Sequence, residues 1–259
     1  MAEQTDKRAI GVFDSGVGGL SCVPAIKRAL PHEQIIFFGD SARNPYGSRP
    51  EEEIIKFAIE DAELLIDKGC KLLSIACNTI SGVASESLKK EFPDIPIVGI
   101  IDPAAEALAK DFAGKQIALI ATDATVKSGV YQRLLKEYGY EREVPAKGCT
   151  IFVPYIERGE TGPDFDRVIK DHLGSFIADA KADVLILGCT HFPFIAENIK
   201  RLYPDLMLFD PAEALAAKTK AVLKEKGLLS GKKTAEDIFL CSSKSEVFDK
   251  FVSDIKQTV

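Results

Sequence analysis

The sequence lacks an excess of basic residues. Its 33 Lys and Arg side chains are outnumbered by 39 Asp and Glu side chains, which gives a formal net charge of −6. Proteins that bind nucleic acids or anionic membranes usually carry a net or clustered positive charge. The composition therefore argues against nucleic acid and membrane surfaces as partners and leaves small molecules and other proteins.

The N-terminal part of the sequence is not expected to be a leader peptide or a membrane span. The residues before Ala9 are polar, and the apolar segment that follows is interrupted by Asp14 and by glycines. Such a segment fits neither a signal peptide nor a membrane span. We expect a cytoplasmic protein that is folded throughout, because no low-complexity tract interrupts a chain that is 46% hydrophobic.

The cysteines show no spacing typical of a disulfide framework or a zinc site. They are scattered along the chain without a CxxC pair, at positions 22, 70, 77, 149, 189 and 241. We therefore predict free thiols and no metal. A small buried apolar residue is the expected role of Cys22, Cys70, Cys149 and Cys241.

Short apolar runs alternate with longer amphipathic ones, which predicts an α/β fold with mainly parallel sheets flanked by helices. Residues 51–68 and 164–179 are expected helices. The expected strands cover residues 10–13, 35–38, 72–76, 97–101, 117–121, 150–153, 184–187 and 207–209.

The strands form two matched sets of four, and the sequence repeats itself accordingly. Residues 71–79 resemble residues 183–191, and residues 101–108 resemble residues 209–215. Either match alone fits chance similarity between strand-turn-helix units, but two matches in the same order favour duplication. We predict two similar lobes related by pseudo-two-fold symmetry, formed by residues 1–100 with 211–259 and by residues 101–210.

Each predicted lobe has one cysteine directly after an apolar strand, Cys77 in the first and Cys189 in the second. Ligands of open α/β sheets bind beyond the carboxyl ends of the strands, so both thiols are expected at a shared cleft. Two opposed thiols can remove a proton from one face of a carbon and return one to the other face. A helix N-terminus after each strand would lower the thiol pKa below its usual value of about 8.5. A single cysteine nucleophile with His191 as its base is an alternative.

Two polar loops are candidates for holding an anionic substrate. Asp14-Ser15-Gly16-Val17-Gly18-Gly19 follows the first strand, and its glycines can expose backbone N–H groups. Residues 39–47 follow the second strand, although an ordinary Pro/Gly loop explains them equally well. Since only Arg43 and Arg49 lie nearby in sequence, backbone amides, hydroxyls and helix N-termini are further candidates for binding the anion.

Six segments taken together resemble the bacterial glutamate racemases of the aspartate/glutamate racemase family. The resemblance extends over nearly the whole chain and rests on residues 11–19, 39–47, 76–79, 125–131, 153–157 and 188–193. It implies a cofactor-free racemase with its active site between two α/β lobes. Its substrate would be glutamate, its oligomeric state a homodimer, and its product D-glutamate for peptidoglycan.

The resemblance also implies roles for individual residues. Cys77 would deprotonate D-glutamate and Cys189 would deprotonate L-glutamate, while Asp14, His191 and Glu157 assist the thiols. The implied substrate-binding residues are Asp14, Ser15, Pro45, Tyr46, Gly47, Asn78, Thr79, Thr190 and His191. Turn hydrogen bonding, helix capping and an exposed carboxylate are the structural alternatives for Asp14, His191 and Glu157.

Ile80, Tyr155 and the Cys149-Thr150 pair depart from the common family pattern. An aspartate racemase and an amino-acid-binding protein without catalytic activity remain as alternative functions.

Overall fold

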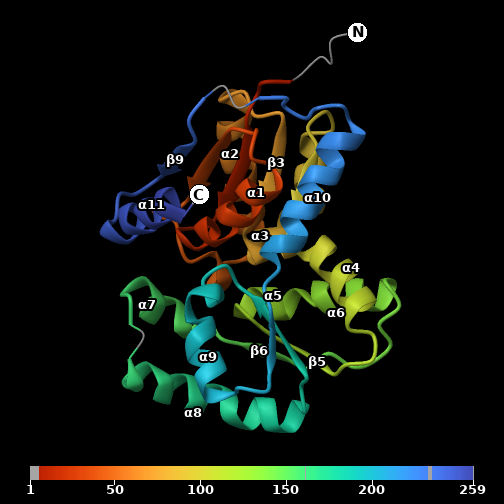
Figure 1. Cartoon of the computed structure of the whole chain (residues 1–259), viewed down its shortest axis with the longest axis vertical. Coiled ribbons are helices and arrows are strands. Elements are labelled where there is room, and N and C mark those ends of the chain that lie inside the picture. The colour runs from red at the N-terminus through yellow and green to blue at the C-terminus, as the bar shows by residue number, and fades with distance from the viewer. Residues whose placement is uncertain (1–5, 161, 233–234, 259) are drawn as a thin grey trace.

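Two separate parallel sheets form the centre of the molecule in this computed structural model, which describes residues 6–160, 162–232 and 235–258 (Figure 1). The first sheet has the strand order β4-β3-β1-β2-β9 and the second β6-β5-β7-β8. Their strands are β1 (Ile10–Asp14), β2 (Ile35–Gly39), β3 (Leu72–Ile75), β4 (Ile97–Gly99), β5 (Ile117–Ala121), β6 (Ala146–Gly148), β7 (Val184–Gly188), β8 (Met207–Phe209) and β9 (Ile238–Cys241).

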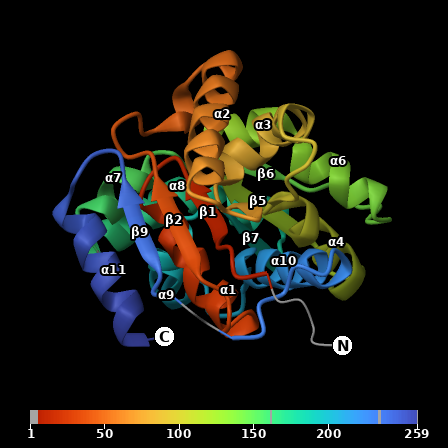
Figure 2. The same cartoon turned by 90° about the horizontal axis from the view of Figure 1, so that it is seen from above.

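Helices cover both faces of the first sheet (Figure 2). Helices α1 (Val23–Ala29) and α10 (Ala212–Glu225) pack on one face, and α2 (Glu51–Asp67) and α3 (Asn78–Glu91) pack on the other. Successive residues of β1 point to opposite faces, so Val12 joins the core with α1 while Phe13 joins the core with α2. This two-sided burial explains why β1 is apolar at nearly every position.

The second sheet is covered in the same way. Helices α4 (Ile101–Asp111), α5 (Asp123–Ser128) and α6 (Val130–Glu137) lie toward one face, and α7 (Phe152–Glu157), α8 (Pro163–Ala180) and α9 (Ala196–Leu202) toward the other. The remaining helical segments are η1 (Gly18–Cys22), η2 (Tyr46–Ser48), η3 (Phe192–Ile195) and α11 (Glu246–Thr258).

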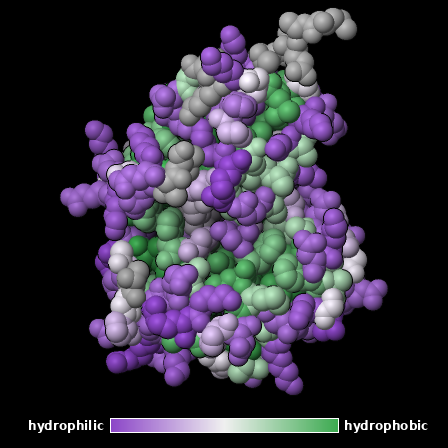
Figure 3. All heavy atoms as spheres, viewed as in Figure 1, coloured by the Kyte–Doolittle hydropathy of each residue, from purple (hydrophilic) through white to green (hydrophobic). Residues whose placement is uncertain are grey.

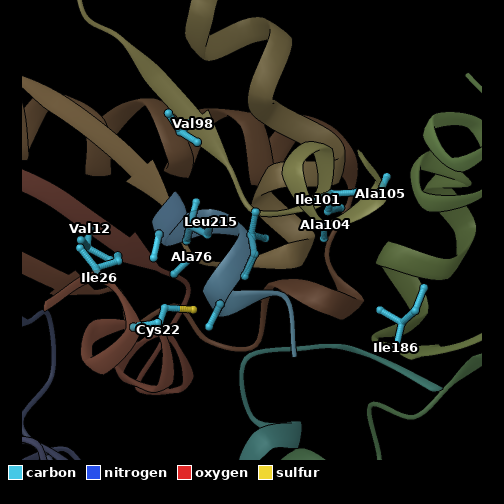
Figure 4. Packing of buried hydrophobic residues seen from close by; sticks show 14 of the residues in the cluster. Val12, Cys22, Ile26, Ala76, Val98, Ile101, Ala104, Ala105, Ile186 and Leu215 are labelled. Carbon is cyan, nitrogen blue, oxygen red and sulfur yellow. The ribbon is translucent and has the colours of Figure 1, made fainter. Parts of the chain in front are cut away.

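The two lobes share one apolar core. A single cluster of buried side chains contains Val12 and Ile26 of the first lobe together with Ile186 of the second, and Ala104 and Leu215 lie between them (Figure 4). The outer surface is different, because hydrophilic side chains cover most of the face shown in Figure 3. A shared core of this kind fixes how the carboxyl ends of the two sheets face each other.

The predicted duplication agrees with the strand orders. In the first sheet β4-β3-β1-β2 has the same arrangement as β8-β7-β5-β6 in the second, and the α/β class with two lobes is confirmed. The chain after Pro211 returns to the first lobe, since α10 packs on α1 and β9 pairs with β2. The boundaries at residues 100 and 210 stay a prediction.

One strand prediction is wrong. Residues 150–153 do not form a strand, because β6 ends at Gly148 and the chain turns into α7, with the Phe152 N–H donating to the Cys149 carbonyl over 3.0 Å. The apolar run is buried all the same, as a helix face that packs Phe152 against Phe165. A short apolar run cannot be assigned to strand or helix from periodicity alone.

Strand β9 was not anticipated. It lies at the edge of the first sheet, and its residues are only partly buried or exposed. No helix in the described part of the chain is long and apolar enough to cross a membrane.

Candidate active site

A small cavity lies between the two sheets, and both predicted catalytic cysteines line it. Its free volume is about 20 Å³, which is room for about one water molecule. The lining residues are Ser15, Asn44, Pro45, Tyr46, Gly47, Cys77, Asn78, Thr79, Thr122, Thr150, Val153, Cys189, Thr190 and His191. The structure thus brings together all the predicted site residues except Asp14 and Glu157, which lie directly behind the lining.

Cys77 is the N-cap of α3. Its Sγ accepts a hydrogen bond from the backbone N–H of Ile80 at 3.5 Å, and its thiol lies 3.5 Å from Ser15 Oγ. Burial, together with the nearby charge of Asp14, raises the pKa of the Cys77 thiol to about 12. The expectation that the helix N-terminus lowers this pKa is therefore wrong for Cys77, because desolvation outweighs the helix contribution. Cys77 is a protonated thiol at neutral pH.

Asp14 ends β1 and is completely buried. One carboxylate oxygen accepts from the Gly16 N–H at 2.9 Å, and the other accepts from the Thr190 hydroxyl at 2.9 Å. The first contact is the turn hydrogen bond of the structural alternative, and the second links the two lobes. Burial raises the pKa of Asp14, while the nearby His191 and these hydrogen bonds lower it.

Cys189 has a different neighbour, the buried side chain of His191. Cys189 Sγ lies 3.8 Å from His191 Nδ1, and His191 Nε2 lies 3.1 Å from Glu157 Oε1. Burial alone would lower the pKa of His191, but the contacts with Cys189 and Glu157 outweigh burial and raise it to about 10. His191 is therefore an imidazolium at neutral pH, and a thiolate at Cys189 would be stabilised by that positive charge.

Glu157 joins the two lobes at the edge of the cavity. It lies at the end of α7, and its Oε1 accepts from Asn44 Nδ2 at 3.2 Å as well as contacting His191. Asn44 follows β2 in the first lobe, and its peptide bond to Pro45 is cis. Glu157 is thus a half-buried contact residue and not the exposed loop carboxylate of the structural alternative.

Asn78 and Thr79 begin helix α3 and face the second lobe. Thr79 Oγ1 lies 2.9 Å from Thr122 Oγ1, which in turn lies 2.9 Å from Thr125 Oγ1. The Tyr131 hydroxyl donates to Asn78 Oδ1 at 2.7 Å. Within the described residues, Asn78 Nδ2 is buried and has no hydrogen-bond partner, so it is an unused donor on a residue that lines the cavity.

The two nearby arginines point away from the cavity. Arg43 pairs with Asp40, Glu60 and Asp61, and Arg49 pairs with Glu53. Among the described residues, no Lys or Arg lines the cavity, so an anion there would depend on His191, neutral donors and the N-terminus of α3. No group of three or more metal-binding side chains is found in the described ranges.

The comparisons with known proteins agree on one family. The family model Asp/Glu/Hydantoin racemase matches residues 10–219. The chain is 40% identical over 220 residues to a glutamate racemase from Aquifex aeolicus (strain VF5), covering 84% of each protein. The chain belongs to the glutamate racemases. Proteins of this family are isomerases.

Solved structures of the family share the whole fold. The crystal structure of glutamate racemase from Francisella tularensis subsp. tularensis SCHU S4 in complex with D-glutamate aligns with a TM-score of 0.89 at 36% identity, over 97% of this chain and 94% of that one. The Thermus thermophilus glutamate racemase in complex with beta-chloro-D-alanine aligns with a TM-score of 0.85 at 36% identity, over 99% and 96%.

The departures from the glutamate racemase pattern lie outside the cavity lining, except for Thr150. Ile80 is buried behind Cys77, and Tyr155 stacks on Phe165 with ring centroids 5.0 Å apart. Thr150 lines the cavity, and its Oγ1 accepts from the Asp123 N–H at 3.0 Å. Ile80 and Tyr155 therefore do not narrow the cavity directly.

Four lining residues were not predicted: Asn44, Thr122, Thr150 and Val153. The duplication contained a signal for Thr122, because it directly follows β5 as Ser15, which also lines the cavity, directly follows β1. Thr150 and Val153 were hidden by the wrong strand assignment. Asn44 had no signal beyond its place in the Pro/Gly loop.

Proposed function

We propose that this protein interconverts L-glutamate and D-glutamate by moving protons at the α-carbon with Cys77 and Cys189. The observation that carries the proposal is that both thiols line one cavity from different lobes. Inversion needs one group that accepts a proton on one face of the carbon and one that donates a proton on the other. The other four cysteines are absent from the cavity lining.

The surroundings of the two thiols support their starting protonation states. The proposed mechanism starts with Cys189 as the thiolate, which the His191 imidazolium 3.8 Å away would balance in charge, and with Cys77, which lies near Asp14, as the thiol. Cys189 S⁻ takes the α-proton of L-glutamate, and the electron pair stays on the substrate as a carbanion. Cys77 S–H then delivers its proton to the opposite face and becomes the thiolate. D-glutamate is converted by the same two transfers in reverse.

Neutral donors and the helix N-terminus would hold the substrate carboxylate. Asn78 Nδ2 is unpaired within the described residues, and the first turn of α3 directs its backbone N–H groups toward the cavity end of the helix. These contacts speed the reaction only if they bind the carbanion more tightly than either enantiomer. We infer that the lobes move apart to admit glutamate, because the cavity has room for about one water molecule.

The family resemblance supports the wider part of the proposal. We propose that the product D-glutamate supplies peptidoglycan synthesis in the cytoplasm and that the protein works as a homodimer. The lobes would comprise residues 1–100 with 211–259 and residues 101–210.

The test is incubation of reduced, cofactor-free protein with L-glutamate and separately with L-aspartate in heavy water, following optical rotation and α-deuterium. Loss of rotation with deuterium gain for glutamate alone supports the proposal. Activity on aspartate alone would contradict glutamate as the substrate and would still support racemisation as the reaction. Neither rotation loss nor exchange with either amino acid would overturn racemisation altogether.

A further inference from the structure

Tyr131 is a completely buried residue that reaches from the second lobe to the first. It lies in α6, and its hydroxyl donates to Asn78 Oδ1 at 2.7 Å, at the start of α3. Figure 1 shows these two helices in different lobes. Tyr131 does not line the cavity, so any effect it has on the substrate acts through Asn78.

The bond fixes which atom of the Asn78 amide is paired with Tyr131 and which is left without a partner. The Tyr131 hydroxyl proton has no other acceptor among the described residues, so it uses the amide oxygen and leaves Nδ2 free. In the flipped amide, the hydroxyl proton would be buried without an acceptor, at the cost of an unmade hydrogen bond. In the flipped amide the unpaired atom of this cavity-lining residue would be an oxygen, and an oxygen repels a carboxylate.

We propose that Tyr131 is a positioning residue, which orients the Asn78 amide so that its N–H₂ group binds the substrate carboxylate. This inference rests on the proposed racemase function. Because the bond joins the two lobes, it also makes the carboxylate site complete only when α6 lies against α3. The hydroxyl contributes through orientation and takes no part in the proton transfers.

Replacing the hydroxyl tests this role. In Tyr131→Phe we expect KM for both enantiomers of glutamate to rise about tenfold while kcat changes by less than about threefold, because the carboxylate is charged in the ground state and the transition state alike. Tyr140→Phe is the matched control. That tyrosine is buried in the same lobe and bonds only backbone groups, the Ile117 N–H and the Lys115 carbonyl, so its loss should leave KM unchanged and lower the unfolding temperature.

A double-mutant cycle separates positioning from a general packing effect. Once Asn78→Ala has removed the amide, Tyr131→Phe should change KM no further. An unchanged KM in Tyr131→Phe, or the same increase in the Asn78→Ala background, would overturn the proposal. Should Tyr131→Phe fold poorly, Asn78→Ala and its double mutant are compared in binding of D-glutamate below the unfolding temperature, where any further loss contradicts the proposal. A wild-type protein that fails to racemise glutamate would instead overturn the proposed function.

Discussion

The two halves of the active site occupy equivalent positions in a duplicated fold but have opposite electrostatic surroundings. Cys77 follows β3 and Cys189 follows β7, the third strand of each copy. Cys77 has the carboxyl group of Asp14 nearby, whereas Cys189 has the imidazole of His191 at 3.8 Å. Duplication therefore supplies the symmetric placement of the thiols, and in the proposed mechanism the single side chains next to them set one thiol as the acid and the other as the base.

This difference fits the requirements of a two-base reaction. With two identical surroundings, both thiols would tend to be protonated or both ionised, and neither state can remove one proton and donate another. Because L- and D-glutamate have equal free energies, kcat/KM must be the same in both directions. The asymmetry is therefore visible in protonation states and pH dependence and not in a preferred direction.

Removing either thiol should abolish racemisation in both directions. We expect Cys77→Ser and Cys189→Ser each to lower kcat/KM for both enantiomers by about 10³-fold or more, because a serine hydroxyl is a poor proton acceptor at neutral pH. Polarimetry measures this loss. Cys241→Ser is the matched control, since Cys241 lies in β9 away from the cavity. Full racemase activity in either active-site variant would rule out the two-thiol mechanism.

Replacing His191 should impair proton removal by Cys189 and leave the surroundings of Cys77 unchanged. In His191→Gln the thiolate of Cys189 loses its neighbouring positive charge, and we expect kcat/KM to fall about 10²-fold, equally for both enantiomers. Initial rates with L- and D-glutamate measure the change. Activity within about twofold of wild type would show that the imidazolium does not support the thiolate.

The His191 charge also predicts how stability depends on pH. Its pKa is raised from 6.5 to about 10 in the folded protein, so its contribution to stability is complete below pH 6.5 and is lost as the pH rises toward 10. Between pH 6.5 and 9 the free energy of unfolding of the wild type should fall relative to that of His191→Gln by on the order of 3 kcal/mol. Urea denaturation at the two pH values measures this, and parallel pH dependences would contradict it.

Replacing Glu157 should have a smaller effect on activity and should shift the pH profile of kcat/KM. Its contact at 3.1 Å helps to raise the pKa of His191, so Glu157→Gln should move the alkaline limb of the kcat/KM profile to lower pH. At neutral pH we expect a loss of only about three- to tenfold, because the amide oxygen can still accept a hydrogen bond from His191. An alkaline limb that stays in place would separate Glu157 from the protonation of His191.

Sequence reasoning found the parts of the fold that depend on local patterns. Continuous apolar runs such as β1 and β7 indicated buried parallel strands, and the repeat around Cys77 and Cys189 indicated two lobes. The strand prediction for residues 150–153 was wrong because these apolar side chains are buried on one face of a helix. Local periodicity does not distinguish such a short apolar run from a buried strand. Strand β9 was missed because it is an edge strand, which is only partly buried and therefore has a weak apolar pattern in the sequence.

The contacts that connect the two lobes could not be predicted from the sequence. The Thr190 to Asp14 and Tyr131 to Asn78 hydrogen bonds join residues far apart in the chain, and their existence depends on how the shared core sets one sheet against the other. The raised pKa of Cys77 was missed for a related reason, since it depends on the burial of the thiol and on the nearby charge of Asp14 in the folded protein.

The most direct test of the two-thiol mechanism is to convert L-glutamate in heavy water and measure α-deuterium separately in each enantiomer at early times. Because Cys189 removes the α-proton and Cys77 delivers a solvent-derived deuteron from the other side, D-glutamate should carry deuterium while the remaining L-glutamate carries almost none. Deuterium appearing equally fast in the unconverted L-glutamate would mean that a single group both removes and returns the proton, and would contradict the mechanism.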